Sequence, residues 1–464
     1  MSEGLPCLVI VFAALTSMTL ATTAAGQERT SQPTSPVVAA VEDVLTLDRA
    51  IELARAHNRE TRRARFEIDR QREASAEART SYFPRLDTYL LGTELLRPLD
   101  FTIRAGQLGT FPSTGPIPGS NVGLHTPARP IAVASFTVTQ PITQLLRTRL
   151  SVAAQRLSEH LGRQSYSQQD QQLVSDVRRV YFSLLQSQSQ AESQRATIRA
   201  LEELGRLTER RLQVRAVLKA DHVRVEAEQA KARYQLLVVE DTLADRKEAL
   251  NWLLGRDLLV AYSVQPVAAA LPAETDLEAA RTLALARRPE IQMAAIKKKQ
   301  AKLETRIEKT RYLPDIAIQA NYLTPAGIDF LPKNIGAVGA LLTWQPWDWG
   351  QKRHNVAQKI IAEREAALTE EEARDQVLLD VDSQFRRLRE ARAQLAVAAS
   401  TREAEQERLR SQTDAYAQEA ILLSALLQQQ ASLATAEDGY RQALLGFWTA
   451  RADFERALGE ESAP

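Results

Sequence analysis

The side chains that could carry chemistry are few and far apart in this sequence of 464 residues. Its five histidines form no His-x-x-x-His pair, and the single cysteine, Cys7, offers them no sulfur partner for a metal site. Those histidines are His57, His125, His160, His222 and His354. Serine and aspartate are scattered over helical faces, without a nucleophile motif or a phosphate-binding loop. The sequence therefore predicts no enzyme, no metal site and no cofactor.

Charge and the first residues limit the class of protein. Lys plus Arg number 59 and Asp plus Glu number 58, so no excess of positive charge supports nucleic-acid binding. An apolar run from Leu8 to Leu20, followed by small residues up to Gly26, predicts a secretory signal peptide over residues 1–26. Residues 27–44 are predicted to be flexible. Because Cys7 lies within the signal peptide, the mature exported chain is predicted to contain no thiol.

The chain is built twice. Tyr82-Phe83-Pro84 recurs as Tyr312-Leu313-Pro314 at an offset of 230, and Leu254-Gly255 recurs as Leu458-Gly459 at an offset of 204. Similarity at a fixed offset indicates a duplicated architecture. The smaller second offset means that the first copy carries about 26 extra residues, which must lie between Tyr89 and Phe136.

Two repeats, 45–265 and 266–464, predict the same order of elements: helices, two strands and a helical hairpin. The first helices end before prolines, since the residue before a proline disfavours the helical region, and the hydrophobic period then changes from about 3.6 to 2. Residues 111–130, rich in proline and glycine, predict an exposed loop without regular structure. The predicted ranges are helices 45–81 and 275–311, strands 84–97, 130–141, 314–324 and 335–346, and hairpins 142–255 and 347–459.

The two long hairpins are predicted to turn near Arg215 to Leu218 and near Ala417 to Leu422. The second helix of each carries two adjacent hydrophobic seams. A two-stranded coiled coil needs one seam per helix, so two seams indicate neighbours on both sides, as in a cylinder of helices. The seams are Leu426, Leu433, Tyr440, Leu444, Phe447, Phe454, Leu458 beside Leu427, Ala431, Ala434, Leu445, Trp448, Ala452, and Val223, Ala227, Ala230, Tyr234, Leu237 beside Leu236, Val239, Leu243, Leu250, Leu253.

Four short amphipathic strands cannot close a barrel, and hydrocarbon does not tolerate the unpaired edges of an open sheet. If these strands cross a membrane, three chains must share one barrel of twelve strands. The predicted fold class is therefore mainly α with a small membrane β part, in which the helical hairpins of a trimer form an α-barrel. The alternative is a soluble periplasmic coiled-coil adaptor or scaffold, which the two equal hairpins disfavour because adaptors usually contain one.

Several pieces taken in order resemble the TolC-like outer-membrane efflux proteins, over residues 45 to 459. They are the Asn58-Arg59-Glu60 and Arg288-Pro289-Glu290 helix junctions, the Tyr-x-Pro helix ends, the Gln140-Pro141 and Gln345-Pro346 strand exits, and the two Leu-Gly pairs. The resemblance implies a homotrimeric, passive conduit in the outer membrane with a periplasmic tunnel. It also implies two partners, a periplasmic adaptor (membrane fusion) protein and an inner-membrane pump, in a tripartite efflux or type I secretion system.

The resemblance directs attention to the hairpin tips. Related proteins commonly have a glycine at each tip and acidic residues near the second, whereas this chain has Arg215 and Glu419 at the tips and Ala425 and Gln428 near the second. Asp221 is the acidic residue that does align. An acidic constriction is therefore not expected, and charged tip residues are candidates for gating or adaptor contacts, unless they are simply solvated. The candidates are Arg215, Lys219, Asp221, Asp414, Glu419 and Gln428.

Two further patterns leave alternatives open. Trp344, Trp347 and Trp349 cluster where the last predicted strand ends, which fits either an aromatic girdle contacting outer-membrane lipid or packing at a strand-to-helix junction. The Arg-rich run from Arg59 to Arg72 fits either a basic surface or a solvated helix face, and the glutamates within it favour the solvated face.

Overall fold

The structure, a computed structural model, describes residues 43–214, 218–266, 276–328, 331–418, 420–421 and 423–459. The predicted signal peptide and nearly all of the segment predicted to be flexible fall outside these residues. From Val44 onward the chain forms one structural unit. None of the helices that the structure describes is long and apolar enough to cross a membrane.

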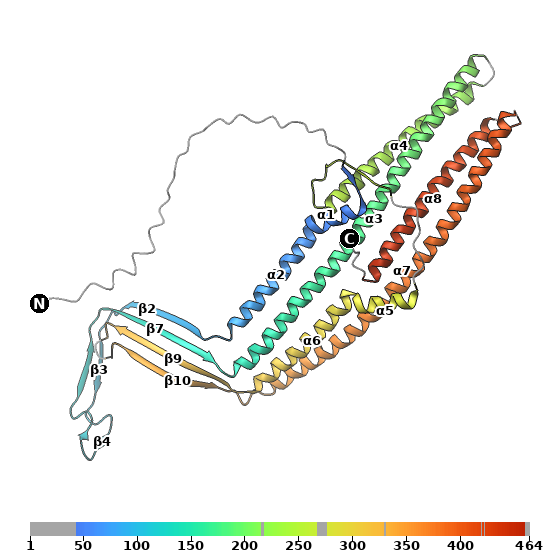
Figure 1. The fold of residues 1–464 in the computed structure, drawn as a ribbon. Coiled ribbons are helices and arrows are strands. Elements are labelled where there is room, and N and C mark those ends of the chain that lie inside the picture. Colours follow the sequence, from blue (N-terminus) through green and yellow to red (C-terminus); the bar gives the residue numbers. More distant parts are fainter. Residues whose placement is uncertain are drawn as a thin grey trace, which may run out of the picture. The chain divides into compact units, whose positions relative to one another are not determined.

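A four-stranded antiparallel sheet lies at one end of the unit (Figure 1). Its order is β10-β9-β7-β2, so each repeat contributes two neighbouring strands and the repeats meet where β7 pairs with β9. In that pairing Phe136 lies opposite Tyr322 and Val138 opposite Ala320. The outermost strands of the sheet are β2 and β10. The strands are β2 (Arg85–Glu94), β7 (Pro130–Pro141), β9 (Asp315–Ala326) and β10 (Ile335–Thr343).

Helices continue each strand and lie side by side in the same order (Figure 1). They are α2 (Arg59–Thr80), α3 (Gln144–Gln213), α6 (Pro289–Lys309) and α7 (Gln351–Ala417). In this helical layer α2 packs on α3, α3 on α6, and α6 on α7, and the 3-10 turn η1 (Thr310–Tyr312) joins α6 to β9. Because strands and helices share one order, the layer has the same two free edges as the sheet, at α2 and at α7.

Each long helix is followed by a helix that runs back along it. These are α4 (Lys219–Leu253), which packs on α3, and α8 (Leu423–Ala457), which packs on both α7 and α3. In α8, the first predicted seam is buried at Leu426, Phe447 and Phe454, as two neighbours require. In α4, by contrast, one seam is buried at Leu250 and Leu253 while the other, including Tyr234 and Leu237, is exposed.

Short helices precede α2 and α6, and local capping explains where they begin. The α1 helix (Leu47–His57) starts at Thr46, whose hydroxyl accepts a hydrogen bond from the Arg49 amide at 3.2 Å, and α5 (Leu277–Arg287) starts at Asp276, which accepts from Ala279 at 3.0 Å. The buried Asn58 side chain caps α2 and also donates to the Leu253 carbonyl at 2.9 Å. At the matching place in the second repeat, Pro289 occupies the first helical position of α6.

The largest hydrophobic core lies where α1, α3 and α4 meet, around Leu45, Val177, Tyr181 and Leu250. It is closed by a two-stranded sheet of β1 (Asp43–Leu45) and β8 (Tyr262–Val264) that the sequence did not predict. The hydroxyl of Tyr181 lies 2.9 Å from the Leu45 carbonyl and 2.8 Å from the Gln265 carbonyl, and burial raises its pKa to about 12. This tyrosine therefore fastens both short strands to α3.

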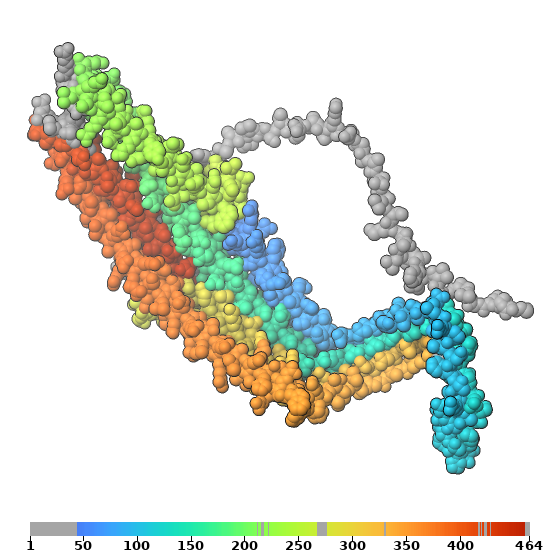
Figure 2. All heavy atoms as spheres, turned by 180° about the vertical axis from the view of Figure 1, so that it is seen from behind, coloured from blue at the N-terminus to red at the C-terminus, as the bar shows by residue number. Residues whose placement is uncertain are grey.

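The predicted loop over residues 111–130 is wrong in part. The extra residues of the first copy form a hairpin that projects from the sheet (cyan in Figure 2), with β3 (Leu99–Ile103) paired to β6 (Val122–Thr126). Near its tip β4 (Thr110–Phe111) pairs with β5 (Gly115–Pro116). Glycines with positive φ, including Gly106 and Gly115, make the turns, so glycine here allows the hairpin to reverse rather than preventing strands.

Candidate functional site

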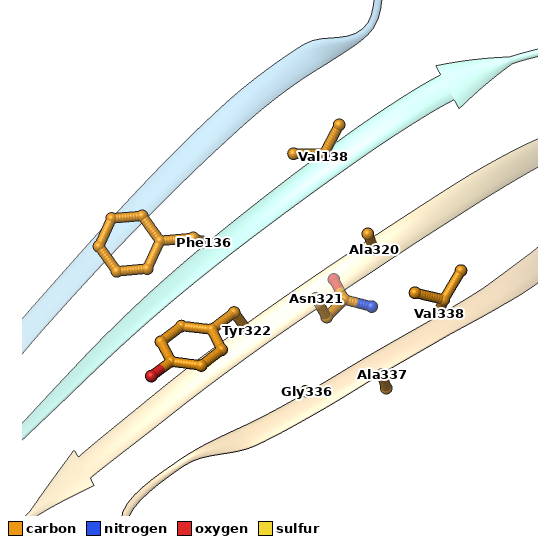
Figure 3. Close-up of a pocket in the computed structure, with 8 residues that line it drawn as sticks. All are labelled: Phe136, Val138, Ala320, Asn321, Tyr322, Gly336, Ala337 and Val338. Carbon is orange, nitrogen blue, oxygen red and sulfur yellow. The ribbon is translucent and has the colours of Figure 1, made fainter.

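One face of the four-stranded sheet is apolar and uncovered. Figure 3 shows its centre, where Phe136, Tyr322 and Val338 project from three neighbouring strands around a shallow hollow of about 300 Å³. The Phe136 and Tyr322 rings lie 6.4 Å apart. Val338 is 80% exposed, which is unusual for an aliphatic side chain that has only water around it. The exposed apolar residues of this face are Leu86, Leu90, Phe136, Val138, Ile316, Ile318, Tyr322, Val338 and Leu342.

The opposite face of the sheet is polar next to the helices. A hollow of about 670 Å³ lies there, lined by both strand and helix residues. Its polar lining consists of Ser81, Arg85, Asp87, Thr137, Thr139, Gln144, Thr148, Asp315, Gln319 and Thr343. Asp315 lies 3.5 Å from the guanidinium of Arg147. We call this side of the sheet and of the helical layer the inner side.

On α3 the inner side continues as a stripe of uncharged residues. Starting from Gln144 and Thr148 in the hollow, steps of three and four residues keep to one side of the helix. These steps give the neutral stripe Gln144, Thr148, Ser151, Gln155, Ser158, Gly162, Ser165 and Gln169. Gln155 donates to Gln71 of α2 at 2.9 Å, and Ser158 accepts from Gln300 of α6 at 2.8 Å. The stripe thus presents hydroxyl and amide groups without any fixed charge.

The free edge of the layer at α7 is apolar. Ile361, Leu368, Leu379 and Val397 are 54%, 59%, 62% and 67% exposed, and their spacing of 7, 11 and 18 residues places them on one side of the helix. The other side of α7 pairs with α6, where Lys359 contacts Glu304 at 2.7 Å. Beside Val397, a groove of about 530 Å³ between α7 and α8 is lined by small residues, including Ala398, Ser432, Ala436 and Gly439. In Figure 2 these two helices, orange to red, form one long border.

The opposite free edge, at α2 and α4, carries matching features. Phe66 on α2 is 65% exposed, on the side away from the buried Ala64 that faces α3. The uncovered seam of α4 includes Val223, Tyr234 and Leu237, which are 49%, 67% and 56% exposed. The prediction that each of these helices has neighbours on both sides therefore identifies, in α4, a side that the chain itself leaves uncovered.

The predicted tip residues lie at the end of the unit far from the sheet (Figure 1), where the two hairpins turn between Gln213 and Lys219 and between Ala417 and Leu423. Lys219, Asp414 and Gln428 are exposed there. Arg215 and Glu419 lie outside the described residues, and of Asp221 only the helical backbone is described. A constriction at the tips therefore stays a prediction.

The three tryptophans lie between the end of β10 and the start of α7. Trp344, Trp347 and Trp349 are 56%, 70% and 88% exposed, so they do not pack into the strand-to-helix junction of this chain. The Trp347 and Trp349 rings meet edge to face at 5.8 Å. Trp349 has a positive φ of 56°, a conformation that is costly for a large side chain and is followed by Gly350 at 89°.

Ion pairs, rather than the inner side, contain the perturbed titratable groups of the helical part. Arg281 of α5 binds both carboxylate oxygens of Asp382 on α7 at 2.8 and 2.6 Å, and these hydrogen bonds lower the pKa of Asp382. Between α6 and α7, Lys298 lies 2.9 Å from Glu370, whose pKa is lowered by this hydrogen bond. No group of three or more His, Cys, Asp or Glu side chains suited to a metal ion occurs among the described residues.

Comparison with known proteins agrees with this geometry. Residues 50–256 match the family model described as outer membrane efflux protein. The fold is similar to the Campylobacter jejuni CmeC outer membrane channel, with a TM-score of 0.73, 15% identity, and coverage of 90% of this chain and 87% of that one. It is also similar to the Vibrio cholerae outer membrane protein VceC (0.70, 14%, 89% and 96%) and to the open state of the Neisseria gonorrhoeae MtrE outer membrane channel (0.68, 18%, 89% and 88%). No curated protein sequence matches the chain.

Together the family match and the fold identify the chain as a TolC-like member of the outer membrane efflux proteins. It is a channel component of an efflux system, located in the outer membrane with a large periplasmic helical part. The predicted fold class and family are confirmed, and the alternative of a soluble adaptor is not favoured. The neutral stripe of α3 was not predicted, although the 3/4 spacing of Ser, Thr and Gln in the sequence was a signal for it.

Proposed function

We propose that three copies of this chain close into one passive channel, in which the inner side of the helical layer and sheet is the lumen wall. The proposal is carried by one observation: the sheet and the helical layer end at the same two edges, and both edges are unfilled. An open sheet with an apolar outer face is unstable in hydrocarbon, whereas joining β2 of one copy to β10 of the next removes every edge.

The two edges of the helical layer are complementary in height. Since α2 runs toward the sheet and α7 away from it, Phe66 lies 14 residues from the sheet end of α2, Ile361 lies 10 and Leu368 lies 17 residues from the sheet end of α7. At about 1.5 Å per residue, Phe66 of one copy reaches the gap between Ile361 and Leu368 of its neighbour. Nearer the tips, the uncovered seam of α4 would lie against Val397 and the adjoining groove.

Charges beyond these apolar contacts also match. Continuing away from the sheet, α2 presents Arg59 and Arg63, and α7 presents Glu372 and Asp375, at similar distances from the sheet. Opposite charges at the same level favour this neighbour and this register over others. The same contact repeated three times closes a ring, because a head-to-tail interface forms rings when the rotation closes.

In this channel the apolar face of the sheet contacts the outer-membrane lipid. The exposed Trp344, Trp347 and Trp349 then lie where the sheet ends and the helices begin, which is the level of the lipid headgroups. Their large exposed fractions support a role in lipid contact rather than in internal packing. The projecting β3–β6 hairpin lies at the other end of the sheet and would face the exterior.

The neutral stripe suits a conduit that does not retain its cargo. Hydroxyl and amide groups exchange hydrogen bonds with water at little net cost, and without fixed charge they do not bind one class of ion. The energy for transport would come from an inner-membrane pump, coupled through an adaptor protein that docks at the hairpin tips. Lys219, Asp414 and Gln428, which are exposed there, are the candidate contacts, together with Arg215, Asp221 and Glu419.

Disulfide cross-linking tests the proposed ring directly. Because the mature chain is predicted to have no cysteine, the pair Phe66→Cys and Leu368→Cys can form a bridge only between copies. We expect covalent dimers and trimers, and nothing larger, in oxidised outer membranes. A matched control, Phe66→Cys with Ala362→Cys on the inner side of α7, should remain monomeric. Efficient bridging of the control pair, or ladders beyond the trimer, would refute this ring.

A further inference from the structure

A basic wall covers the side of the helical layer that faces away from the hollow. On α6, Lys299, Lys302, Arg306 and Lys309 follow each other in steps of three and four residues, and all four are exposed. They lie between the residues that contact α3, such as Gln300, and those that contact α7, such as Thr305. Their side of α6 is therefore a free surface of the layer.

The two neighbouring helices continue this wall. On α3, the exposed stripe Arg149, Arg156, His160 and Arg163 is turned away from the neutral stripe, and each of its members follows a step of three, four or seven residues. On α2 the exposed stripe is Arg62, Arg65, Arg72 and Arg79. Following the helix rotation from the contacts of each helix with its neighbours puts all three stripes on the same, outer side.

Few acidic groups neutralise the basic wall. Within the described part of these stripes the acidic neighbours are Asp69, on the α2 stripe, and Glu159, which pairs with Arg163 at 2.7 Å. Arg65 binds the hydroxyl of Tyr166 at 2.9 Å instead of a carboxylate. The whole chain has a formal net charge of only +1, so the wall results from the segregation of charge and not from a basic composition.

The stripes run along the helix axes, and this direction distinguishes between anionic partners. Lys299 and Lys309 are about 15 Å apart along α6 at about 1.5 Å per residue. In an outer-membrane protein these axes point from the membrane into the periplasm, so a flat layer of lipid headgroups could touch only the cations nearest the sheet. A periplasmic polyanion lying against the outer surface could contact all of them.

We propose that the basic wall binds the carboxylate-bearing cell-wall glycan of the periplasm, peptidoglycan. This inference rests on the proposed function, because it requires the neutral stripe to line the lumen and the basic wall to face the periplasm. Lysine and arginine at steps of three and four residues lie about 5–6 Å apart, which suits repeated carboxylates along a polymer. Such binding would hold the long periplasmic part upright within the cell wall and keep its tips accessible to a partner.

Co-sedimentation of the detergent-purified full-length protein with isolated peptidoglycan sacculi tests the proposal. We expect salt-sensitive binding that falls by about tenfold in Lys302→Gln/Arg306→Gln, since each cation near an anionic surface contributes measurably. The control, Lys297→Gln/Arg311→Gln, removes two cations from the other side of the same segment and should bind as the unmodified protein does. Glutamine at exposed helical positions preserves helix propensity.

Each outcome is distinguishable from a failure of the channel itself. The disulfide between Phe66→Cys and Leu368→Cys, placed in every variant, reports the ring independently of sacculus binding. Equal binding by the two double variants, or no binding by a correctly cross-linked protein, would overturn the proposal. Binding to vesicles of phosphatidylglycerol with none to sacculi would also overturn it, and would assign the wall to lipid. Loss of the cross-link in the unmodified background would instead refute the proposed ring.

Discussion

The inner and outer sides of α3 differ in chemistry although they belong to the same helix. Thr148 and Arg149 are adjacent in sequence, yet Thr148 lines the polar hollow and Arg149 belongs to the basic wall. Along the inner side the helix carries Gln, Ser, Thr and Gly, and along the outer side Arg and His. Since successive residues point about 100° apart, one helix can present an inert surface and a binding surface at once. The difference teaches that the lumen of a conduit is marked by the absence of charge.

The comparison of two sides has meaning only if the ring closes, so opening the ring should have the largest effect. Leu368→Asp with Leu379→Asp places two charges in the proposed contact, and burying each without a partner costs several kcal/mol. We expect complete loss of trimer and of efflux, measured by native mass spectrometry and by drug susceptibility of a host strain. Ala367→Asp, on a neighbouring side of α7, serves as the control and should assemble. Intact trimers in the double variant would contradict the assignment of this edge.

Exchanging the chemistry of the two sides should have the next largest effect. Thr148→Arg would add one cation per chain to the inner side, and a barrier of about 1.4 kcal/mol slows passage about tenfold. We expect efflux of cationic substrates to fall by about that factor while neutral substrates are affected far less. Arg149→Gln, the adjacent substitution on the outer side, should leave both rates unchanged. Equal sensitivity at the two positions would remove the distinction between the sides.

The hairpin tips lie beyond both sides, where the walls end. Reversing the charge at Lys219 and Asp414 should reduce pump-dependent efflux by only a few-fold, because exposed charge pairs contribute about 0–1 kcal/mol each. Trimer formation should not change. Efflux measured with and without an overproduced adaptor tests this, since excess adaptor should restore activity if docking is what weakens. No change in efflux at any adaptor level would mean that these tips are merely solvated.

The comparison also predicts where acid acts. The neutral stripe has no titratable group, whereas Asp382 has a lowered pKa because of Arg281. A lowered carboxylate pKa contributes stability above the unfolded value, about 3.9, and this contribution is lost as the pH falls through the folded value. Because the pair is partly exposed, Asp382→Asn should cost less than about 1 kcal/mol. Thermal unfolding of both proteins at pH 7 and pH 3 should show a difference that shrinks at pH 3, and a difference that grows would be contradictory.

Much of this architecture could be predicted from the sequence because duplication and periodicity are strong signals. Tyr82-Phe83-Pro84 and its copy mark the same helix-to-strand junction, and the seams of α8 are buried as their spacing requires. Strands β1 and β8 could not be predicted, because each has three residues and depends on a distant partner, Tyr181. The β3–β6 hairpin was missed because proline and glycine permit its turns as readily as they disrupt regular structure.

The candidate surfaces were harder to predict than the elements. The Arg-rich run from Arg59 to Arg72 was interpreted mainly as a solvated face, since the sequence cannot show that α3 and α6 add cations on the same side. The neutral stripe was overlooked because a lumen requires only polar, uncharged groups, which also occur on ordinary helix surfaces. What distinguishes it is continuity with Thr148 and the hollow below the sheet, and continuity appears only in three dimensions.

Thiol labelling of the assembled protein tests the inner and outer assignment most directly. Single cysteines at Ser151 and Ser158 on the neutral stripe, and at Arg156 and Lys302 on the basic wall, would be exposed to a small maleimide and to a protein-sized maleimide conjugate. The account predicts that the small reagent labels all four positions in the trimer and that the large one labels only Arg156→Cys and Lys302→Cys. Labelling of the two serine positions by the large reagent, with protection at the other two, would contradict it.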